Sequence, residues 1–589
     1  MDNMITLTID GVQVSVPAGT TVLEAARKAN IKIPTLCYLK DLNAIGACRM
    51  CVVDTGARAL QAACVLPATE GMVVKTNTPK LRQYRKTLLE MLLSIHDRKC
   101  LTCSRNNNCE LQDLCRDLGV ENENAFAGSV NEYEIDDASP CVVRNNNKCV
   151  LCRRCVAACH AQQNVGVIGP VGRGFKTQIA SPWGLKLAQT GCVGCGQCIV
   201  ACPVGALKEK DSIKPVTELL FSGKHVFVQT APAVRAALGE EFGLPMGEAV
   251  TGKMVAALRR LGFEKVFDTD YAADLTILEE GTELVQRIKN NGVLPMITSC
   301  SPGWVKYCET YNADFIPNLS SCKSPHEMLG AVIKTYYAEK VGIAPEDIKV
   351  VSVMPCTAKK FEATRPELSE EGQQDVDEVL TTRELAAMIR MAGIDFANLP
   401  DEEFDSVLGE STGAGVIFGA TGGVMEAALR FAYEVLTGET LENVEFNAVR
   451  GLQGVKEAQL ELGGLKLSIA VAHGTANAQK VLDSVEISFS LNSFAITASV
   501  IGALPSFLLA LGGGQPIVKA SVRDTVNVSA LRAQALYNED AGKARRKSQD
   551  NEEVKTLYKE YLGEIGGHKA HEILHTTYTA RDKYAGTDN

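Results

Sequence analysis

Apolar and polar side chains alternate on either side of Asp10-Gly11 in the opening stretch ITLTIDGVQVSV. This alternation predicts two strands joined by a tight turn, because an Asp-Gly pair tolerates the positive φ that such turns require. In the next stretch, TTVLEAARKANI, Thr21 and Glu24 have the spacing of a capping box and predict the start of a helix. A hairpin, a helix and a cysteine-containing loop therefore predict a small α+β domain over residues 1–78.

Helical spacing of apolar residues returns in LRQYRKTLLEMLLSIH at 81–96 and brings His96 to a cysteine-rich loop. After residue 215 the pattern changes. Apolar strands such as HVFVQTA, VLPMITS and IKVVSVMP alternate with helical stretches such as AADLTILEEGTELVQRIKNN. Such alternation is typical of a parallel sheet that helices cover on both faces. Residues 212–589 are therefore predicted to form one α/β domain.

Composition and charge exclude several classes of protein. Of 589 residues, 46% are hydrophobic and 22% charged, as in an ordinary globular protein. The net charge of −10 gives no electrostatic reason to expect a nucleic-acid partner. No basic segment precedes an apolar one at the N-terminus, so we expect a cytoplasmic protein. Residues 487–518 carry no charge and could span a bilayer, but Pro505 and the glycines at 512–514 interrupt them and favour no membrane partner.

The 21 cysteines cluster in CxxC repeats, which favours metal ligation in a reducing compartment over disulfides. The pattern C-x2-C-x2-C-x3-C occurs twice, at 149–159 and at 192–202, within a loop-rich region at 140–211. In two-cluster ferredoxins the fourth cysteine of each pattern ligates the other 4Fe–4S cluster, and zinc would not explain this duplication. The pattern predicts one cluster on Cys149, Cys152, Cys155 and Cys202 and a second on Cys192, Cys195, Cys198 and Cys159, with the two halves related by a pseudo-twofold axis.

Two further ligand sets precede this region. Cys37, Cys48, Cys51 and Cys64 predict a 2Fe–2S cluster, although the ten-residue first gap leaves a zinc ribbon as the alternative. His96, Cys100, Cys103 and Cys109 predict a 4Fe–4S cluster with a neutral imidazole ligand in a domain at 79–139; a charged histidine at a helix end is the alternative. The four cysteines without partners at useful spacing are expected to be small buried apolar residues: Cys115, Cys141, Cys308 and Cys322.

Four clusters in about 210 residues form an electron wire, and three strings indicate what lies at its end: TSCSPGW (298–304), MPCTAKKFEATRPE (354–367) and FGATGGVMEAALR (418–430). With these strings the chain resembles the iron-only (FeFe) hydrogenases over essentially its whole length, most closely the NADP-reducing type. The first 210 residues alone also resemble the iron–sulfur subunit of NADH dehydrogenase, but the strings argue against it. The resemblance implies an α/β catalytic domain preceded by small α+β ferredoxin-like iron–sulfur domains.

The resemblance also implies a reaction and a site. The reaction is reversible oxidation of dihydrogen at an H-cluster, a 4Fe–4S cubane joined to a binuclear iron unit. The wire would pass electrons to a flavin- or NAD(P)-binding partner subunit or to ferredoxin. Cys356 matches a cubane ligand, Lys359 a residue that hydrogen-bonds an iron-bound cyanide, and Met354 a neighbour of the binuclear iron. The positions of the family's proton path are Cys300, Glu280, Ser320, Glu283 and Arg287.

The residues themselves support only part of this path. Glu280 and Glu283 are three positions apart and share one face of a predicted helix, which is also the pattern of a solvated helix face. The family string TSCCPxW has a second cysteine as cubane ligand, and here Ser301 stands in its place. Serine is a poor ligand for a soft metal site, so Cys300 is left as either ligand or proton relay.

The second departure lies near the C-terminus. The family has E-x-M-x-C-x-x-G-C shortly before GGGQP, and both of those cysteines ligate the cubane. This chain has no cysteine after Cys356, and only hydroxyls such as Ser499 and Ser506 lie in the corresponding stretch. Three hypotheses follow: an active hydrogenase whose sequence is misread at about 484–511, a degenerate iron–sulfur assembly or sensor protein, and an electron-transfer subunit of an NADH-dehydrogenase-like complex.

Overall fold

The computed structural model describes residues 4–370, 372–420, 422–440, 447–448, 454–462, 465–489, 497–501 and 528–584. Ser506, the GGGQP string and most of the uncharged stretch at 487–518 lie outside the described residues. Within the described ranges, the model contains no helix with the length and apolar character needed to cross a membrane.

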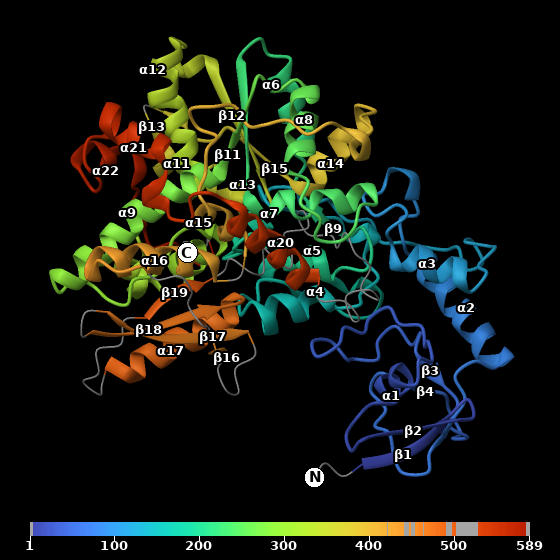
Figure 1. Cartoon of the computed structure of the whole chain (residues 1–589). Helices are drawn as coiled ribbons and strands as arrows, with labels where there is room; N and C mark the ends of the chain where they lie inside the picture. Colours follow the sequence, from blue (N-terminus) through green and yellow to red (C-terminus); the bar gives the residue numbers. More distant parts are fainter. Residues whose placement is uncertain are drawn as a thin grey trace.

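The hairpin predicted at the N-terminus is confirmed (Figure 1, lower right). Strands β1 (Met4–Ile9) and β2 (Val12–Pro17) pair antiparallel, and Asp10 and Gly11 in the turn have φ of 49° and 85°. The side chain of Thr21 accepts a hydrogen bond from the backbone N–H of Glu24, as the capping pattern predicted. The remaining elements of this domain are α1 (Val22–Lys28), β3 (Val52–Val53), β4 (Gln61–Ala62) and β5 (Val73–Val74), which pairs parallel to β1.

Helix α2 (Pro79–Leu93) leads from this domain to the next cysteine loop. It starts two residues before the predicted stretch because Thr78 caps it and Pro79 occupies its first turn, where a missing N–H costs nothing. It ends before His96, which therefore lies in the loop. The short helix α3 (Glu110–Asp117) follows that loop.

The region at 140–211 has an arrangement expected of two related halves. Each half supplies one strand to an antiparallel pair, β6 (Val142–Arg144) with β9 (Leu207–Glu209), and one short helix, α4 (Arg154–Ala157) packed on α5 (Gln197–Ala201). A small hairpin, β7 (Gly169–Val171) and β8 (Gln178–Ala180), completes the region.

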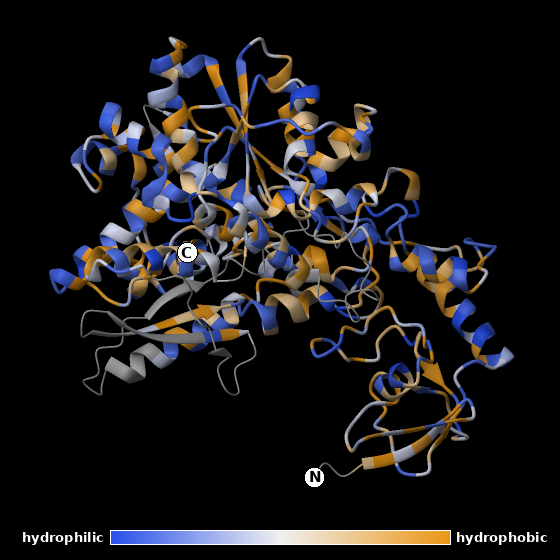
Figure 2. Ribbon diagram, in the orientation of Figure 1, coloured by the Kyte–Doolittle hydropathy of each residue, from blue (hydrophilic) through white to orange (hydrophobic). Residues whose placement is uncertain are grey.

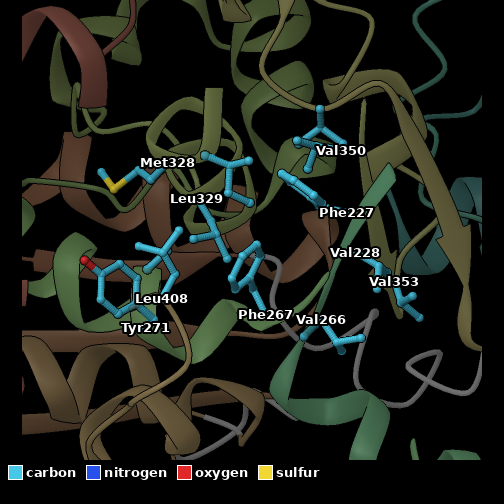
Figure 3. Close-up of a cluster of buried hydrophobic side chains, with 14 of the residues drawn as sticks. Phe227, Val228, Val266, Phe267, Tyr271, Met328, Leu329, Val350, Val353 and Leu408 are labelled. Atoms are coloured by element: carbon cyan, nitrogen blue, oxygen red, sulfur yellow. The ribbon is translucent and has the colours of Figure 1, made fainter. Parts of the chain in front are cut away.

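A parallel four-stranded sheet forms the core of the following domain, in the order β11–β10–β12–β15. The strands are β10 (His225–Thr230), β11 (Lys265–Asp268), β12 (Ile348–Met354) and β15 (Glu378–Thr381). Figure 3 shows Phe227, Phe267, Leu329 and Val350 in the apolar core of this domain. Figure 2 shows apolar strands at the centre and polar residues toward the outside of the surrounding helices. The predicted parallel α/β architecture is confirmed.

One predicted strand is wrong. VLPMITS (293–299) makes a single bridge, between Ile297 and Leu319, and joins no described sheet. The apolar composition of this segment predicts a strand. Pro295, however, lacks the backbone N–H that pairing within a sheet requires.

Helices surround the sheet, and later parts of the chain return to it. Helices α9 and α11 pack on one another, and α16 packs on α9 (Figure 1). From the C-terminal part, α20 packs on α15, α21 on α9 and α22 on α11. Their bounds are α6 Ile213–Leu220, α7 Pro232–Arg235, α8 Thr251–Leu261, α9 Thr269–Lys289, α10 Pro302–Tyr311, α11 Pro325–Val332, α12 Ala338–Val341, α13 Lys359–Glu362, α14 Thr382–Met391, α15 Gly413–Val416, α16 Gly423–Thr437, α17 Thr475–Phe489, α20 Val528–Gly542, α21 Glu552–Leu557 and α22 His568–Leu574.

A second sheet lies beside this domain, in the order β16–β17–β18–β19. Its strands are β16 (Asn447–Ala448), β17 (Val455–Leu462), β18 (Leu465–Ala472) and β19 (Thr497–Ile501). The last of them contains Ser499, of which only the backbone is described.

Candidate active site and its cysteine-lined clusters

Four thiols meet at the loops of the N-terminal domain. The backbone N–H of Cys37 donates to Sγ of Cys48 at 3.4 Å. Side-chain hydrogen bonds from Cys48 and Cys64 lower the pKa of Cys37 to about 6 and that of Cys51 to about 7. The same two hydrogen bonds raise the pKa of Cys48 and of Cys64, so two of the four thiols are shifted toward the thiolate that ligates iron.

The second predicted set contains a buried, neutral imidazole. Burial, and then the charge of Lys148, lower the pKa of His96 to about 4. Nδ1 of His96 is buried and has no hydrogen-bond partner among the described residues, which fits a ring nitrogen placed to bind a metal. Cys103 lies close enough to Cys109 for its charge to raise the pKa of that thiol. Cys109 and Cys100 in turn lie close enough to Cys115 to raise its pKa. Burial raises the pKa of Cys115, which has no predicted ligand role.

Two separate cavities lie in the region at 140–211, and each is lined by four of its eight cysteines. One is lined by Cys149, Cys152, Cys155 and Cys202 and has an empty volume of about 420 Å³, open solvent included. The other is lined by Cys159, Cys192, Cys195 and Cys198 and has an empty volume of about 450 Å³, again with open solvent included. The fourth cysteine of each sequence pattern thus lies with the first three of the other pattern.

A larger cavity of about 780 Å³ lies at the carboxyl ends of the parallel strands. Ala231 and Pro232 follow β10, Pro355 and Cys356 follow β12, and all four line the cavity. Ligands bind at this edge of open α/β sheets because the loops there diverge. The other lining residues relevant to the predicted site are Cys300, Ser301, His326, Met354, Lys359, Phe418 and Val424.

Lys359 is fixed at the wall of this cavity by two buried groups. Its Nζ donates to Oγ of Ser324 at 2.8 Å and to the carboxylate of Glu362. Glu362 also lies 2.7 Å from Nε2 of His326. Burial alone would raise the pKa of Glu362, but the Lys359 ammonium and His326 hold it at about 2. The carboxylate of Glu362 therefore balances the positive charge that the Lys359 ammonium presents at the cavity wall.

The residues of the predicted proton path follow one another from the cavity outward. Burial, and then the charge of Glu280, raise the pKa of Cys300 to about 12. Burial and the carboxylate of Glu283 raise the pKa of Glu280 to about 7, and neither oxygen of Glu280 makes a hydrogen bond of ordinary geometry among the described residues. Oε2 of Glu283 accepts from Oγ of Ser320 at 3.1 Å, and Oε1 accepts from Arg287.

Five family models match the chain. The model described as iron only hydrogenase large subunit, C-terminal domain, matches residues 224–494, and the iron hydrogenase small subunit model matches 526–581. Before them lie a 2Fe-2S iron-sulfur cluster binding domain at 2–79, an NADH-ubiquinone oxidoreductase-G iron-sulfur binding region at 85–124 and a 4Fe-4S dicluster domain at 148–206.

Similar proteins extend over the whole chain. The NADP-reducing hydrogenase subunit HndD of Solidesulfovibrio fructosivorans is 47% identical over 99% of this chain and 100% of its own length. The chain belongs to the iron-only hydrogenases. Iron hydrogenase 1 of Clostridium pasteurianum is 42% identical over 98% of this chain and 100% of its own. A solved structure of a variant of the [FeFe]-hydrogenase HydA1 from Chlamydomonas reinhardtii aligns with a TM-score of 0.56 at 39% identity, over 62% of this chain and 98% of that one.

Family membership confirms the predicted fold class and the kind of enzyme. This hydrogenase carries domains of the 2Fe–2S and 4Fe–4S types, which favours iron over zinc at the cysteine sets. The match described as iron hydrogenase small subunit covers α20 through α22 in full.

The donor set of the catalytic cavity does not fit the cubane of an H-cluster. A cubane held by the protein needs four soft ligands, and the cavity brings together two cysteines, Cys300 and Cys356, with Ser301 beside them. The sequence contains no cysteine beyond Cys356 to complete the set. The two cavities at 140–211 are each lined by four cysteines, whereas the catalytic set is short of thiolates.

Several residues at these sites carried no signal in the sequence. Ser321 and His575 contact Glu283 and its surroundings, and His326 with Glu362 supports Lys359. A histidine outside any motif is more often a core residue, and only the fold brings these two to the site. Glu362 alone had a usable signal, because it lies three residues after Lys359 on one helix.

Proposed function

We propose that this hydrogenase exchanges electrons between its catalytic cavity and an external protein through four accessory clusters, in support of reversible dihydrogen oxidation. One 2Fe–2S and three 4Fe–4S clusters would occupy the four ligand sets. When bound, these clusters transfer single electrons. The observation that carries the proposal is that the loops holding the four sets touch one another in an order that ends at the catalytic cavity.

The first contacts in this order join both outer sets to the same inner set. The side-chain amide of Asn43 donates to the backbone carbonyls of Cys37 at 2.7 Å and of Cys152 at 3.1 Å. Arg105, in the loop of the His/Cys3 set, donates to the carbonyl of Cys202 at 2.8 Å. Cys152 and Cys202 belong to the same cavity, so two inputs would converge on one cluster.

The last contact joins the inner clusters to the catalytic cavity. Oγ1 of Thr357 donates to the carbonyl of Gly194 at 2.6 Å. Gly194 lies between Cys192 and Cys195, and Thr357 follows Cys356. This short contact supports a position of the last accessory cluster next to the catalytic cavity, from which electrons would pass directly.

The external partner is proposed from two observations. The name of the relative in Solidesulfovibrio describes a subunit of an NADP-reducing hydrogenase. No glycine-rich nucleotide-binding loop was identified in this sequence, so NAD(P) would bind a separate flavin-containing subunit. Ferredoxin, which needs no nucleotide site, is the alternative partner.

A second function is favoured by the short ligand set at the catalytic cavity. A chain with the accessory clusters and no complete catalytic cubane would be an iron–sulfur protein without hydrogenase activity, serving in cluster assembly or sensing. The residues that line the catalytic cavity would then be inherited from the family without a catalytic role.

The two functions are separated by purifying the full chain under anaerobic conditions. We expect reduction of methyl viologen by dihydrogen, with four accessory clusters by iron and sulfide analysis and by EPR of the reduced protein. Four clusters without any dihydrogen-dependent dye reduction would support the second function. Fewer than four clusters would remove the basis of the proposed wire.

A further inference from the structure

The carboxylate of Glu283 is the meeting point of several hydrogen bonds. Its Oε2 accepts from Oγ of Ser320 at 3.1 Å, from the backbone N–H of Ser321 at 3.0 Å and from Oγ of Ser321 at 3.1 Å. Its Oε1 accepts two hydrogen bonds from Arg287. A proton that reached Glu283 from the cavity would therefore have either Arg287 or Ser321 as its next neighbour.

Arg287 is poorly suited to carry that proton. A guanidinium keeps its proton at any pH a protein survives and has no lone pair with which to accept another. Its remaining donors are also fixed, because they bond the carbonyl oxygens of Val293, Pro317, Asn318 and Leu319. Arg287 therefore orients Glu283 and holds the loop at 317–319, and the proton needs another exit.

Ser321 connects Glu283 to the C-terminal part of the chain. Its Oγ lies 2.8 Å from Nδ1 of His575, a residue 254 positions away that directly follows α22. Nε2 of His575 lies 3.2 Å from Oε2 of Glu279. The ring of His575 stacks on that of His571, with 4.3 Å between the centroids, and His571 is exposed at the surface. His575 itself is 8% exposed.

We propose that Ser321 and His575 form a proton exit branch from Glu283, supplied by the segment that matches the hydrogenase small subunit. This inference rests on the proposed function and names residues that the family resemblance did not. In one state, a protonated Glu283 donates to Oγ of Ser321, and the Ser321 hydroxyl donates to Nδ1 of a neutral His575.

In the other state, both protons have moved one place along this line. The Glu283 carboxylate accepts from the Ser321 hydroxyl, and Nδ1–H of the His575 imidazolium donates to Oγ of Ser321. The Ser321 oxygen loses one proton and gains another, so charge and atoms balance. Nε2–H of His575 donates to Glu279 in both states, which fixes the tautomer that the relay needs.

The groups facing His575 favour its role as a carrier of positive charge. From α9 come the carboxylates of Glu279 and Glu283, with Arg287 beyond Glu283. The carboxylate of Glu279 accepts hydrogen bonds from the hydroxyl of Tyr558 and from the backbone N–H of Gly566. Cys322 and, on the outer side, His571 complete the surroundings of His575. Two nearby carboxylates would stabilise the positive charge that His575 carries in the second state.

A metal ion at the same place is the competing interpretation, since Glu283, Cys322 and His575 could together hold one. Two observations argue against it. Glu283 already accepts five hydrogen bonds, two of them from the Arg287 cation. Burial raises the pKa of Cys322 well above its usual range, so its thiol keeps the proton that a metal would have to displace.

The first test follows the protonation of His575 in the full chain and needs no catalysis. Histidine labelled with ¹⁵N in the ring is titrated by NMR, and the His575 signal is the one lost in His575→Gln. We expect Glu283→Gln to lower the titration midpoint of His575 by about one pH unit, because the neighbouring negative charge is gone. We expect Ser321→Ala to lower it as well and Ser321→Thr to restore it. His568→Gln, at an exposed position on α22, is the matched control.

The second test measures proton transfer in the dihydrogen-oxidising protein. Ser321→Ala and His575→Gln should slow turnover by about tenfold or more, with a changed pH profile and a larger solvent deuterium isotope effect, and Ser321→Thr should recover the rate. Unchanged rates and pH profiles in both variants, or a His575 midpoint indifferent to Glu283→Gln and Ser321→Ala, would overturn the branch. If the unmodified chain oxidises no dihydrogen while its accessory clusters are complete, the proposed function fails, and the NMR midpoints alone decide the relay.

Discussion

At the scale of single residues, Glu280 and Glu283 differ sharply although both lie on α9. Glu283 accepts hydrogen bonds on both oxygens, whereas Glu280 accepts none of ordinary geometry among the described residues. Burial, with the charge of Glu283, raises the pKa of Glu280 to about 7. A buried carboxyl with so few partners titrates near neutrality because water no longer stabilises its charged form. That property suits a proton carrier and costs stability.

Glu280→Gln should stabilise the catalytic domain above neutral pH. The folded pKa of Glu280 lies above the unfolded value of 4.5, so its contribution to stability is lost as pH rises from about 4.5 to about 7. The variant escapes this loss, which amounts to about 3 kcal/mol. Unfolding of the full chain, followed at pH 5 and pH 8, should show a small gain at pH 5 and nearly all of it at pH 8. Glu283→Gln, the control, should destabilise at both because it breaks the ion pair with Arg287; an equal gain for Glu280→Gln at both pH values would contradict the assignment.

Cys300→Ala distinguishes a proton relay from a metal ligand. If Cys300 only relays protons, turnover should fall by a factor of about 10² to 10⁴ while the iron content stays the same. Iron analysis, together with dye reduction by dihydrogen, measures both. Loss of iron in the variant would show instead that Cys300 is a ligand, taking the place that Ser301 cannot fill.

At the scale of elements, loops and short helices hold the cysteine sets, and glycines let those loops approach one another. Gly194 and Gly196 have positive φ, and a Cβ at Gly196 would lie 2.7 Å from Oγ1 of Thr357. The contact between the last accessory set and the catalytic domain thus depends on a residue without a side chain.

Gly205 is not one of the predicted ligands, yet Gly205→Ala should disrupt the predicted His/Cys3 ligand set. A Cβ at residue 205 would lie 2.4 Å from Sγ of Cys103, so either the loop or the thiol must move. We expect loss of about four iron atoms and of one 4Fe–4S EPR signal. Gly128→Ala is the matched control because its Cβ would meet nothing within 4 Å. A variant that keeps all its iron would show that Cys103 is not held by a cluster at this position.

Paired cysteine variants test the crossed ligation. Cys155 and Cys202 line one cavity and Cys198 lines the other. Each single change to alanine should cost one cluster. The pair Cys155→Ala with Cys202→Ala should therefore lose no more iron than either alone, whereas Cys198→Ala with Cys202→Ala should lose two clusters. The reverse result would assign Cys202 to the cluster of its own sequence pattern.

At the scale of the whole molecule, hydrogen bonds between loops link two outer domains to the region at 140–211, and that region to a cavity at the edge of a parallel sheet. The C-terminal helices close this domain from the side of α9 and α11. These contacts lead to Cys356, and the ligand set of the final site departs from the pattern that the family resemblance implies.

The mass of a single tryptic peptide decides between the hypotheses for this departure. Trypsin cleaves after Lys480 and Lys519, and residues 481–518 contain no lysine or arginine. If the sequence is misread there, a protein that oxidises dihydrogen should lack a peptide of the mass calculated for 481–519. The same coding stretch, read in its other frames, should supply the two missing cysteines. That peptide in an active enzyme would refute the misreading, and in an inactive protein it would favour the degenerate relative.

Patterns that are local in the chain could be predicted from the sequence. The hairpin, the cap at Thr21, the strands at 225–231 and 348–355 and the long helix at 269–289 all depend on residues a few positions apart. The cysteine spacings likewise fix which loops carry ligands, because three thiolates separated by two residues converge without help from the rest of the fold.

Contacts between distant residues were decided only by the tertiary structure. VLPMITS has the composition of a strand, yet its proline and its neighbours leave it outside the sheet. His575 reaches Ser321 across 254 positions, and Asn43 reaches Cys152 across 109. No periodicity marks such partners, because packing of whole elements brings them together. The sequence by itself determined the ligand types and the family, whereas the order of the sites and the surroundings of Glu283 came from the way in which the separate elements pack.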